Sequence, residues 1–161
     1  MASKGYGSHL PVLMKVVGMT TGDIVELGTG TNSTPFLHWS CYPTKRHLVS
    51  YDCQPKYFPY AEMFRDDFHE VHFVEDWDKI DLAKPWSVAF VDHSPNTRRI
   101  VDIKRLLHAE YVVVHDTENK RDKDYGYSEI FPLFKYHYKY REVMPHTSVL
   151  SNVHDLSNFR I

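Results

Sequence analysis

The sequence predicts an α/β fold with a mainly parallel, seven-stranded sheet that carries helices on both faces. Short apolar runs alternate along the chain with amphipathic or turn-rich stretches, a pattern typical of repeated strand–helix–strand units. No internal repeat or Pro/Gly/Ser-rich linker interrupts the 161 residues. We therefore expect one domain that spans residues 1–161.

Seven segments are predicted as strands, at residues 23–27, 47–51, 71–74, 86–91, 111–114, 138–143 and 147–150. The first five are short apolar runs bounded by turn residues, as expected for strands buried in a parallel sheet. The last two flank a turn that contains Pro145. They are expected to close the sheet as a C-terminal antiparallel hairpin.

Helices are predicted between these strands, at residues 8–17, 34–41, 56–67, 94–107 and 127–134. Gly18 is expected to close the first helix. Thr34 is the predicted N-cap of the second, with Pro35 at its first helical position. Ser94 and Pro95 are expected to cap the fourth. One face of that helix collects apolar residues at helical spacing, namely Ile100, Ile103, Leu106 and Leu107.

Composition and charge exclude several classes of protein. The formal net charge is −2, from 19 basic and 21 acidic residues, which argues against a nucleic-acid partner. Cys41 and Cys53 alone cannot build a disulfide framework, and the first residues lack the apolar core of a signal peptide. No apolar run is long enough to cross a bilayer. We expect a cytoplasmic protein without a membrane partner.

Acidic residues follow four of the first five predicted strands, at Asp52, Glu75–Asp76, Asp92 and Asp116. The remaining strand runs through Glu26 into the glycine turn at residues 28–30. Because ligands of open α/β sheets bind beyond the carboxyl ends of the strands, we expect these groups to gather in one cleft.

The glycine turn lets the backbone approach a ligand closely, because Gly28 and Gly30 have no Cβ. Asp52 follows Gly28 by 24 residues, close to the spacing expected for an acid that binds a ribose. A nicotinamide dinucleotide fingerprint needs a third glycine where this chain has Ser33. This difference disfavours the alternative of a nicotinamide-dependent oxidoreductase.

The segment IVELGTGTNS, residues 24–33, resembles the first motif of class I S-adenosylmethionine-dependent methyltransferases, E/D-x-G-x-G-x-G. Asn32, which tolerates a left-handed backbone, replaces the last glycine. The resemblance extends through weaker motifs over residues 23–119. It implies a Rossmann-like fold and transfer of the methyl group of S-adenosylmethionine to an oxygen, or with less support a nitrogen.

The resemblance also implies a cofactor site. Glu26 would organise the amino group of the cofactor through water, Asp52 would accept hydrogen bonds from both ribose hydroxyls, Asp76 would bind the adenine amino group, and Trp77 would cover the adenine ring. The glycines would line the methionine and ribose part. The full set of implied cofactor-binding residues is Glu26, Gly28, Thr29, Gly30, Asn32, Asp52, Asp76 and Trp77.

Two acid–histidine pairs, Asp92-His93 and His115-Asp116, end neighbouring predicted strands. They resemble the pattern of catechol-type and cephalosporin-hydroxylase-like O-methyltransferases, many of which bind Mg²⁺. The resemblance implies Asp92 and Asp116 as metal ligands, and carboxylates suit that ion. Two departures are Thr117 beside the last acid and Pro95 where a lysine base is expected. Alternatively, His93 or His115 would act as general base beside Asp92, since an imidazole titrates near neutral pH.

The methyl acceptor is left open between a small molecule, a glycan and a protein. Because the first predicted strand begins after about 20 residues, we expect an acceptor site that is open or completed by a second subunit of a homo-oligomer. Arg98 and Arg99 are expected on a solvated helix face, or in contact with an anionic substrate. A remaining alternative is a module that binds S-adenosylmethionine or a nucleotide without turnover.

Overall fold

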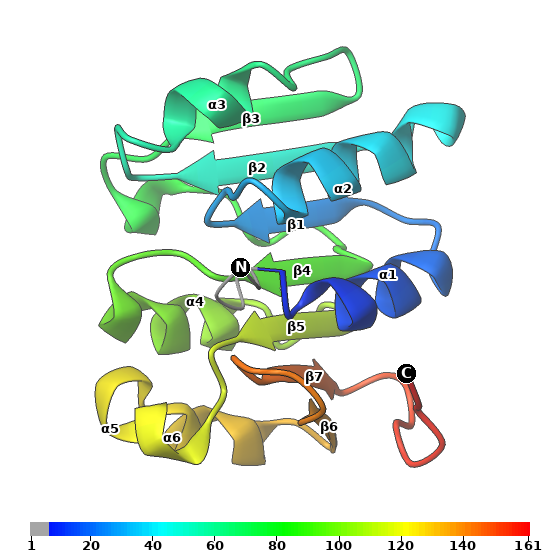
Figure 1. Ribbon diagram of the computed structural model, residues 1–161, viewed down its shortest axis with the longest axis vertical. Helices are drawn as coiled ribbons and strands as arrows, with labels where there is room; N and C mark the ends of the chain where they lie inside the picture. Colours follow the sequence, from blue (N-terminus) through cyan, green and yellow to red (C-terminus); the bar gives the residue numbers. More distant parts are fainter. Residues whose placement is uncertain (1–6) are drawn as a thin grey trace.

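The computed structural model describes residues 7–161, whose seven strands form one sheet in the order β3-β2-β1-β4-β5-β7-β6 (Figure 1). The strands are β1 Ile24–Leu27, β2 Leu48–Asp52, β3 His69–Phe73, β4 Val88–Val91, β5 Tyr111–His115, β6 Tyr136–Tyr140 and β7 Thr147–Ser151. The first five pair in parallel, and β7 pairs antiparallel with both β5 and β6. The predicted fold class is confirmed, including the closing hairpin.

Helices cover both faces of the sheet: α1 Leu10–Gly18, α2 Ser33–Cys41, α3 Phe58–Glu62, α4 Arg99–Arg105, α5 Asp122–Tyr125 and α6 Tyr127–Ile130. Alternate strand residues face opposite sides. Ile24 therefore packs in one core cluster with α1 and α2, whereas Val25 packs in the other cluster with α4 and α6. Within residues 7–161, none of the helices has the length and apolar composition that a bilayer crossing requires.

Several predicted helix limits were wrong. The helix expected at 56–67 is only the five residues of α3, where Ala61 alone is buried, so little packing supports a longer helix. Helix α2 begins one residue before Thr34, and Asn32 occupies the N-cap position without a side-chain cap. The helix predicted from Ser94 starts as a short 3₁₀ turn, Asn96–Arg98, and continues as α4.

The topology fixes where a ligand site can form. From β1 the chain builds β2 and β3 on one side, and then crosses to build β4 and β5 on the other (Figure 1). In the parallel register, Leu27 at the end of β1 pairs with Tyr51 of β2 and Val91 of β4. The carboxyl ends of β1, β2 and β4 therefore meet at the point where the strand order reverses, which is the preferred ligand position in such sheets.

Candidate functional site

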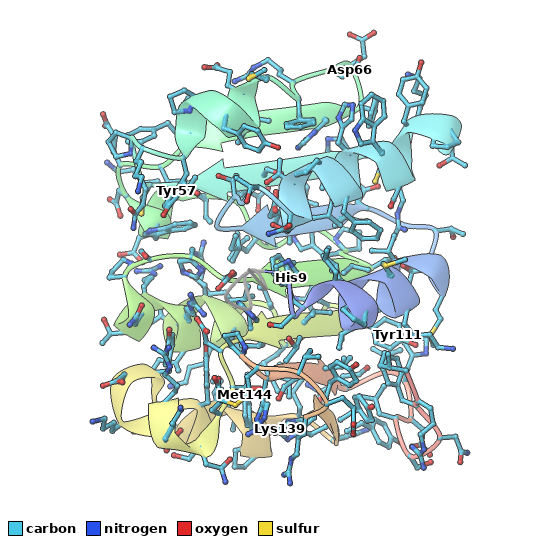
Figure 2. The ribbon with its side chains drawn as sticks, in the orientation of Figure 1. His9, Tyr57, Asp66, Tyr111, Lys139 and Met144 are labelled. Carbon is cyan, nitrogen blue, oxygen red and sulfur yellow. The ribbon has the colours of Figure 1, made fainter. Side chains whose placement is uncertain are left out.

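A cavity of about 340 Å³ lies beyond the carboxyl ends of β1, β2 and β4. Its lining includes residues 28–33 after β1, Asp52 at the end of β2, and residues 92–94 after β4. Figure 2 labels two further lining residues, His9 and Tyr57, which come from the segments just before α1 and α3. Asp52 and Tyr57 belong to one stretch of chain, so four segments that are distant in sequence build this site.

Gly28 is a geometric requirement of this site. Its φ is +91°, and a Cβ at this position would lie 2.6 Å from backbone atoms of Asp92 and His93. A side chain would therefore push the first loop away from β4. Asn32, by contrast, has an ordinary φ of −111°. Its tolerance of a left-handed backbone is not needed, so the missing third glycine of the motif leaves the loop intact.

Asp52 holds the loop after β1 against the end of β2. Its side chain accepts hydrogen bonds from the backbone nitrogen of Thr29 at 2.8 Å and the Thr29 hydroxyl at 2.6 Å. The backbone nitrogen of Gln54 donates a third bond, of 2.7 Å. A carboxylate offers about four acceptor positions, so these contacts leave about one for a ligand.

Glu26 lies fully buried behind the same loop. Its carboxyl group accepts hydrogen bonds from the Thr34 hydroxyl at 3.0 Å and the Ser50 hydroxyl at 2.6 Å. The Thr34 oxygen in turn accepts a hydrogen bond from the backbone nitrogen of Gly30 at 3.0 Å. Burial raises the pKa of Glu26 to about 7, although the hydroxyl donors oppose the rise. Glu26 thus supports the loop through the Thr34 hydroxyl, which lies between its carboxyl group and Gly30.

Two histidines extend this network across β2 and β3. Ser50 Oγ lies 2.9 Å from Nε2 of His69, and Nδ1 of His69 lies 3.1 Å from Nδ1 of His38 in α2. Burial lowers the pKa of His69 to about 4 and also lowers that of His38. We call Glu26, Thr34, Ser50, His69 and His38 the Glu26 network. Both histidines are hydrogen-bonded within it, and burial favours their uncharged forms.

Arg99 lies on the opposite side of β1, at the start of α4, with 4% of its surface exposed. Its guanidinium donates hydrogen bonds to the backbone oxygens of Asp92 and His93 and forms an ion pair of 2.9 Å with the Asp92 carboxylate. A longer contact of 3.4 Å reaches Asp116. The prediction of a solvated Arg99 was therefore wrong, because the loops after β4 and β5 enclose it.

Asp92 and His115 form a pair beside Arg99. His115 Nδ1 lies 3.2 Å from Asp92 Oδ2. Burial opposes both charges, but the mutual contact raises the pKa of His115 and, together with Arg99, lowers that of Asp92. On its other side, Nε2 of His115 lies 2.9 Å from the Ser8 hydroxyl, which donates a hydrogen bond to the backbone oxygen of Pro145.

His9 borders both the cavity and the Asp92–His115 pair. Its ring lies 4.9 Å, centroid to centroid, from the ring of His115 in an edge-on arrangement. Only 3% of the residue is exposed, and neither ring nitrogen has a hydrogen-bond partner within residues 7–161. Burial and the neighbouring His115 lower the pKa of His9 to about 4. We call His9, Asp92, His115 and Arg99 the Asp92 cluster.

His93 lines the cavity, but its ring is directed into the core. Nε2 lies 3.0 Å from the carboxylate of the buried Asp102 in α4, and the ring centroid lies 4.2 Å from that of Trp77. Burial lowers the pKa of His93, although Asp102 opposes the shift. The side chain thus joins the end of β4 to α4.

The structure separates Asp76 and Trp77 from the cavity lining. Asp76 caps the short helix Trp77–Lys79 by accepting a hydrogen bond from the backbone nitrogen of Asp78, and it borders a neighbouring hollow beyond β3. Trp77 is 7% exposed and packs in the core. The expectation that the strand-end acids gather in one cleft was therefore wrong for Asp76.

Asp116 also lies apart from the cavity lining. It has a φ of +59°, and its carboxylate accepts a hydrogen bond from the Tyr125 hydroxyl at 2.9 Å. In the part of the chain that the structure describes, the group of side chains close enough to share a metal ion contains Asp92 with His9 and His115, and does not contain Asp116. The predicted pairing of Asp92 with Asp116 as metal ligands does not fit this arrangement.

Sequence reasoning missed His9 and the buried role of Arg99. His9 precedes the first helix by one residue, and only the fold brings it to the ends of β4 and β5. For Arg99, a signal was present in the two strand-end acids that required a buried counter-charge.

No protein-family model and no curated protein sequence matches this chain. Solved structures do. Cofactor-bound Rv0187 from MTB has a TM-score of 0.68 at 17% identity, over 96% of this chain and 83% of its own. SAH-bound methyltransferase PaMTH1 from Podospora anserina has a TM-score of 0.66 at 11% identity, over 94% and 80%. N-methyltransferase NodS from Bradyrhizobium japonicum WM9 has a TM-score of 0.64 at 11% identity, over 91% and 95%.

At these identities the likeness is one of fold. This chain has the Rossmann-like fold of class I S-adenosylmethionine-dependent methyltransferases, as its first motif predicted.

Proposed function

We propose that this protein is a methyltransferase that binds S-adenosylmethionine in the 340 Å³ cavity and methylates an oxygen acceptor. The observation that carries the proposal is the position of Asp52 and Gly28 on one cavity wall at the reversal of strand order. The names of the structural neighbours support the cofactor, since one is SAH-bound and another cofactor-bound. They include N-methyltransferase NodS and a ribosomal protein L11 methylase, so the acceptor atom needs its own test.

The residues of the cavity fit such a nucleoside. Gly28 leaves open the space that a Cβ would fill, and Gly30 and Asn32 continue the same wall. Asp52 has about one acceptor position free for a ribose hydroxyl. Binding of both hydroxyls, as the resemblance implies, requires the Thr29 hydroxyl to turn away from Asp52. Glu26 supports the loop from behind through Thr34 and Gly30.

The acceptor is proposed to approach from the side of the cavity opposite Asp52. There Asp92 and His93 border the cavity, and His115 lies behind Asp92. When bound, S-adenosylmethionine supplies a methyl group already activated by a sulfonium, so the protein acts chiefly by aligning the two reactants. Asp92 faces this approach with His115 in contact behind it, whereas His93 positions the end of β4 through Asp102.

Isothermal titration with S-adenosylmethionine and S-adenosylhomocysteine tests the cofactor site. Asp52→Ala is expected to weaken binding by about 1.5–3 kcal/mol, because a carboxylate that accepts ribose hydrogen bonds is removed. Asp67→Ala is the matched control, since this exposed acid lies in the turn before β3. Equal affinity in the wild type and the Asp52 variant would contradict the proposal.

Two rival functions predict different results. A module that binds without turnover would bind the nucleoside tightly and methylate none of the hydroxylated small molecules, glycans or proteins offered. A nicotinamide-dependent oxidoreductase would be stabilised by NAD rather than by S-adenosylmethionine in a thermal-shift measurement. Ser33, where that class needs glycine, lies in the loop that lines the cavity.

A further inference from the structure

The imidazole ring of His9 is nearly enclosed by the protein but makes no hydrogen bond within residues 7–161. Both of its ring nitrogens are buried and lack a partner there. A buried polar group without a partner costs about 1–3 kcal/mol. Because folded proteins pair almost all such groups, an orphaned histidine beside other ligating atoms indicates a bound species.

The neighbouring histidine shows where that species would lie. The Ser8 hydroxyl gives its single proton to the backbone oxygen of Pro145, so its oxygen accepts from Nε2–H of His115. Nδ1 of His115 faces the Asp92 Oδ2 atom at 3.2 Å. When Nδ1 carries a proton, it donates to this oxygen; when it does not, the nitrogen and the oxygen can both bind one cation.

His9 supplies a third ligand for that charge. One ring nitrogen each of His9 and His115 and one carboxylate oxygen of Asp92 lie within 4.8 Å of one another. We propose that these three side chains bind a divalent transition-metal ion, with Zn²⁺ the best match. Tetrahedral zinc places its ligand atoms about 3.3 Å apart. The 3.2 Å contact already meets this spacing, and His9 has no described hydrogen bond to break as it moves inward.

The ligand chemistry and the surrounding charges suit zinc better than magnesium. Two imidazole nitrogens and one carboxylate favour a borderline ion, whereas Mg²⁺ prefers oxygen ligands. Arg99 pairs with Oδ1 of Asp92 and leaves Oδ2 for the ion. Asp116 offsets the charge of Arg99. The Ser8 contact to Nε2 of His115 is the outer hydrogen bond that orients a metal-binding histidine.

The site would keep a coordination position open toward the cavity. His9 and Asp92 both line the cavity, so an ion between them would face the acceptor side. An ion in this position would lower the pKa of an acceptor hydroxyl. This role rests on the proposed methyltransferase function, but binding of the ion does not.

Titration of the chelator-treated protein with Zn²⁺, followed by calorimetry, tests the proposal. We expect one ion per chain, and His9→Ala is expected to weaken binding by roughly 100-fold or more because a ligand is lost. Ser8→Ala should weaken it by about 10–100-fold, since it removes only the outer hydrogen bond. His108→Ala is the matched control, because this exposed histidine contacts the backbone oxygen of Lys84 far from the site.

The variants also guard against a folding artefact. Circular dichroism establishes whether His9→Ala is folded, and Ser8→Ala, which leaves all three ligands in place, provides an independent test. Co²⁺ in place of Zn²⁺ should show visible absorption that disappears in His9→Ala and persists in His108→Ala. Mg²⁺ should bind far more weakly than Zn²⁺.

Unchanged zinc affinity in His9→Ala and Ser8→Ala would overturn the site, as would equal losses in the His108 control. Zinc binding without S-adenosylmethionine binding would uphold the metal site and refute the proposed function. Binding of S-adenosylmethionine without binding of zinc would refute the metal site alone.

Discussion

Two clusters of buried polar side chains flank the cavity, and they differ in charge and in hydrogen bonding. The Glu26 network, on the β2–β3 side of β1, joins its side chains through hydroxyl and imidazole hydrogen bonds, and burial lowers the pKa of both its histidines. The Asp92 cluster, on the β4–β5 side, holds a buried guanidinium between the Asp92 and Asp116 carboxylates, and its His9 has no hydrogen-bond partner among residues 7–161.

The difference indicates a division of labour. A satisfied polar network rigidifies its surroundings, which suits a support for the loop that receives the nucleoside. A charged cluster that contains a buried histidine without a hydrogen-bond partner among residues 7–161 suits the binding of an ion or a substrate. We infer that the β2–β3 side is scaffold and the β4–β5 side is reactive.

The largest expected effect on stability concerns Arg99. Arg99→Met leaves the Asp92 and Asp116 carboxylates without their buried counter-charge, and we expect the free energy of unfolding to fall by about 3 kcal/mol. Arg98→Met is the control, because Asp102 keeps His93 and Arg105 as partners when Arg98 is lost. It should cost about 1 kcal/mol. Urea unfolding measures both, and equal losses would remove the special role of Arg99.

The next effect concerns the pH dependence produced by Glu26. Its pKa is about 7 in the folded protein against an ordinary value of 4.5, so between these values unfolding releases a proton. Stability should therefore fall as pH rises from about 4.5 to 7, by on the order of 3 kcal/mol from this group. Glu26→Gln should remove that component.

The measurement is the difference between the urea-unfolding curves of wild type and Glu26→Gln across this pH range, which cancels the other titrating groups. If the difference is independent of pH, Glu26 is not the neutral centre of its network.

The smallest effect compares two buried threonines. Thr34→Val breaks the link from Gly30 to Glu26 and should cost about 1–2 kcal/mol of unfolding free energy. Thr147 is equally buried, but its hydroxyl has no hydrogen-bond partner within residues 7–161. Thr147→Val should therefore be neutral or slightly stabilising. Thermal unfolding would contradict the account if the two variants behaved alike.

The parts of the fold that the sequence predicted are those decided by burial. The strands β1, β4 and β5 are buried along their whole length, and their apolar runs were visible with limits correct to about two residues. The failures lie where burial is slight. Helix α3 buries only Ala61, so local preferences over residues 56–67 had no packing to support them.

The residues of the candidate site also differ in whether the sequence could predict their positions. The approach of Asp52 to the loop after β1 follows from parallel pairing of adjacent strands, and it was predictable from spacing. His9 reaches the Asp92 cluster because α1 packs across β4 and β5, with Ser8 fastened to His115 and Pro145. No local pattern carries that information, since the contacts join residues more than 100 positions apart.

A crystal structure with S-adenosylhomocysteine bound would locate the cofactor site. We expect a ribose hydroxyl within hydrogen-bonding distance of Asp52, the loop after β1 against the nucleoside, and the sulfur directed toward Asp92. A nucleoside bound elsewhere on the chain, or crystals that never take it up at saturating concentration, would contradict the proposed methyltransferase function.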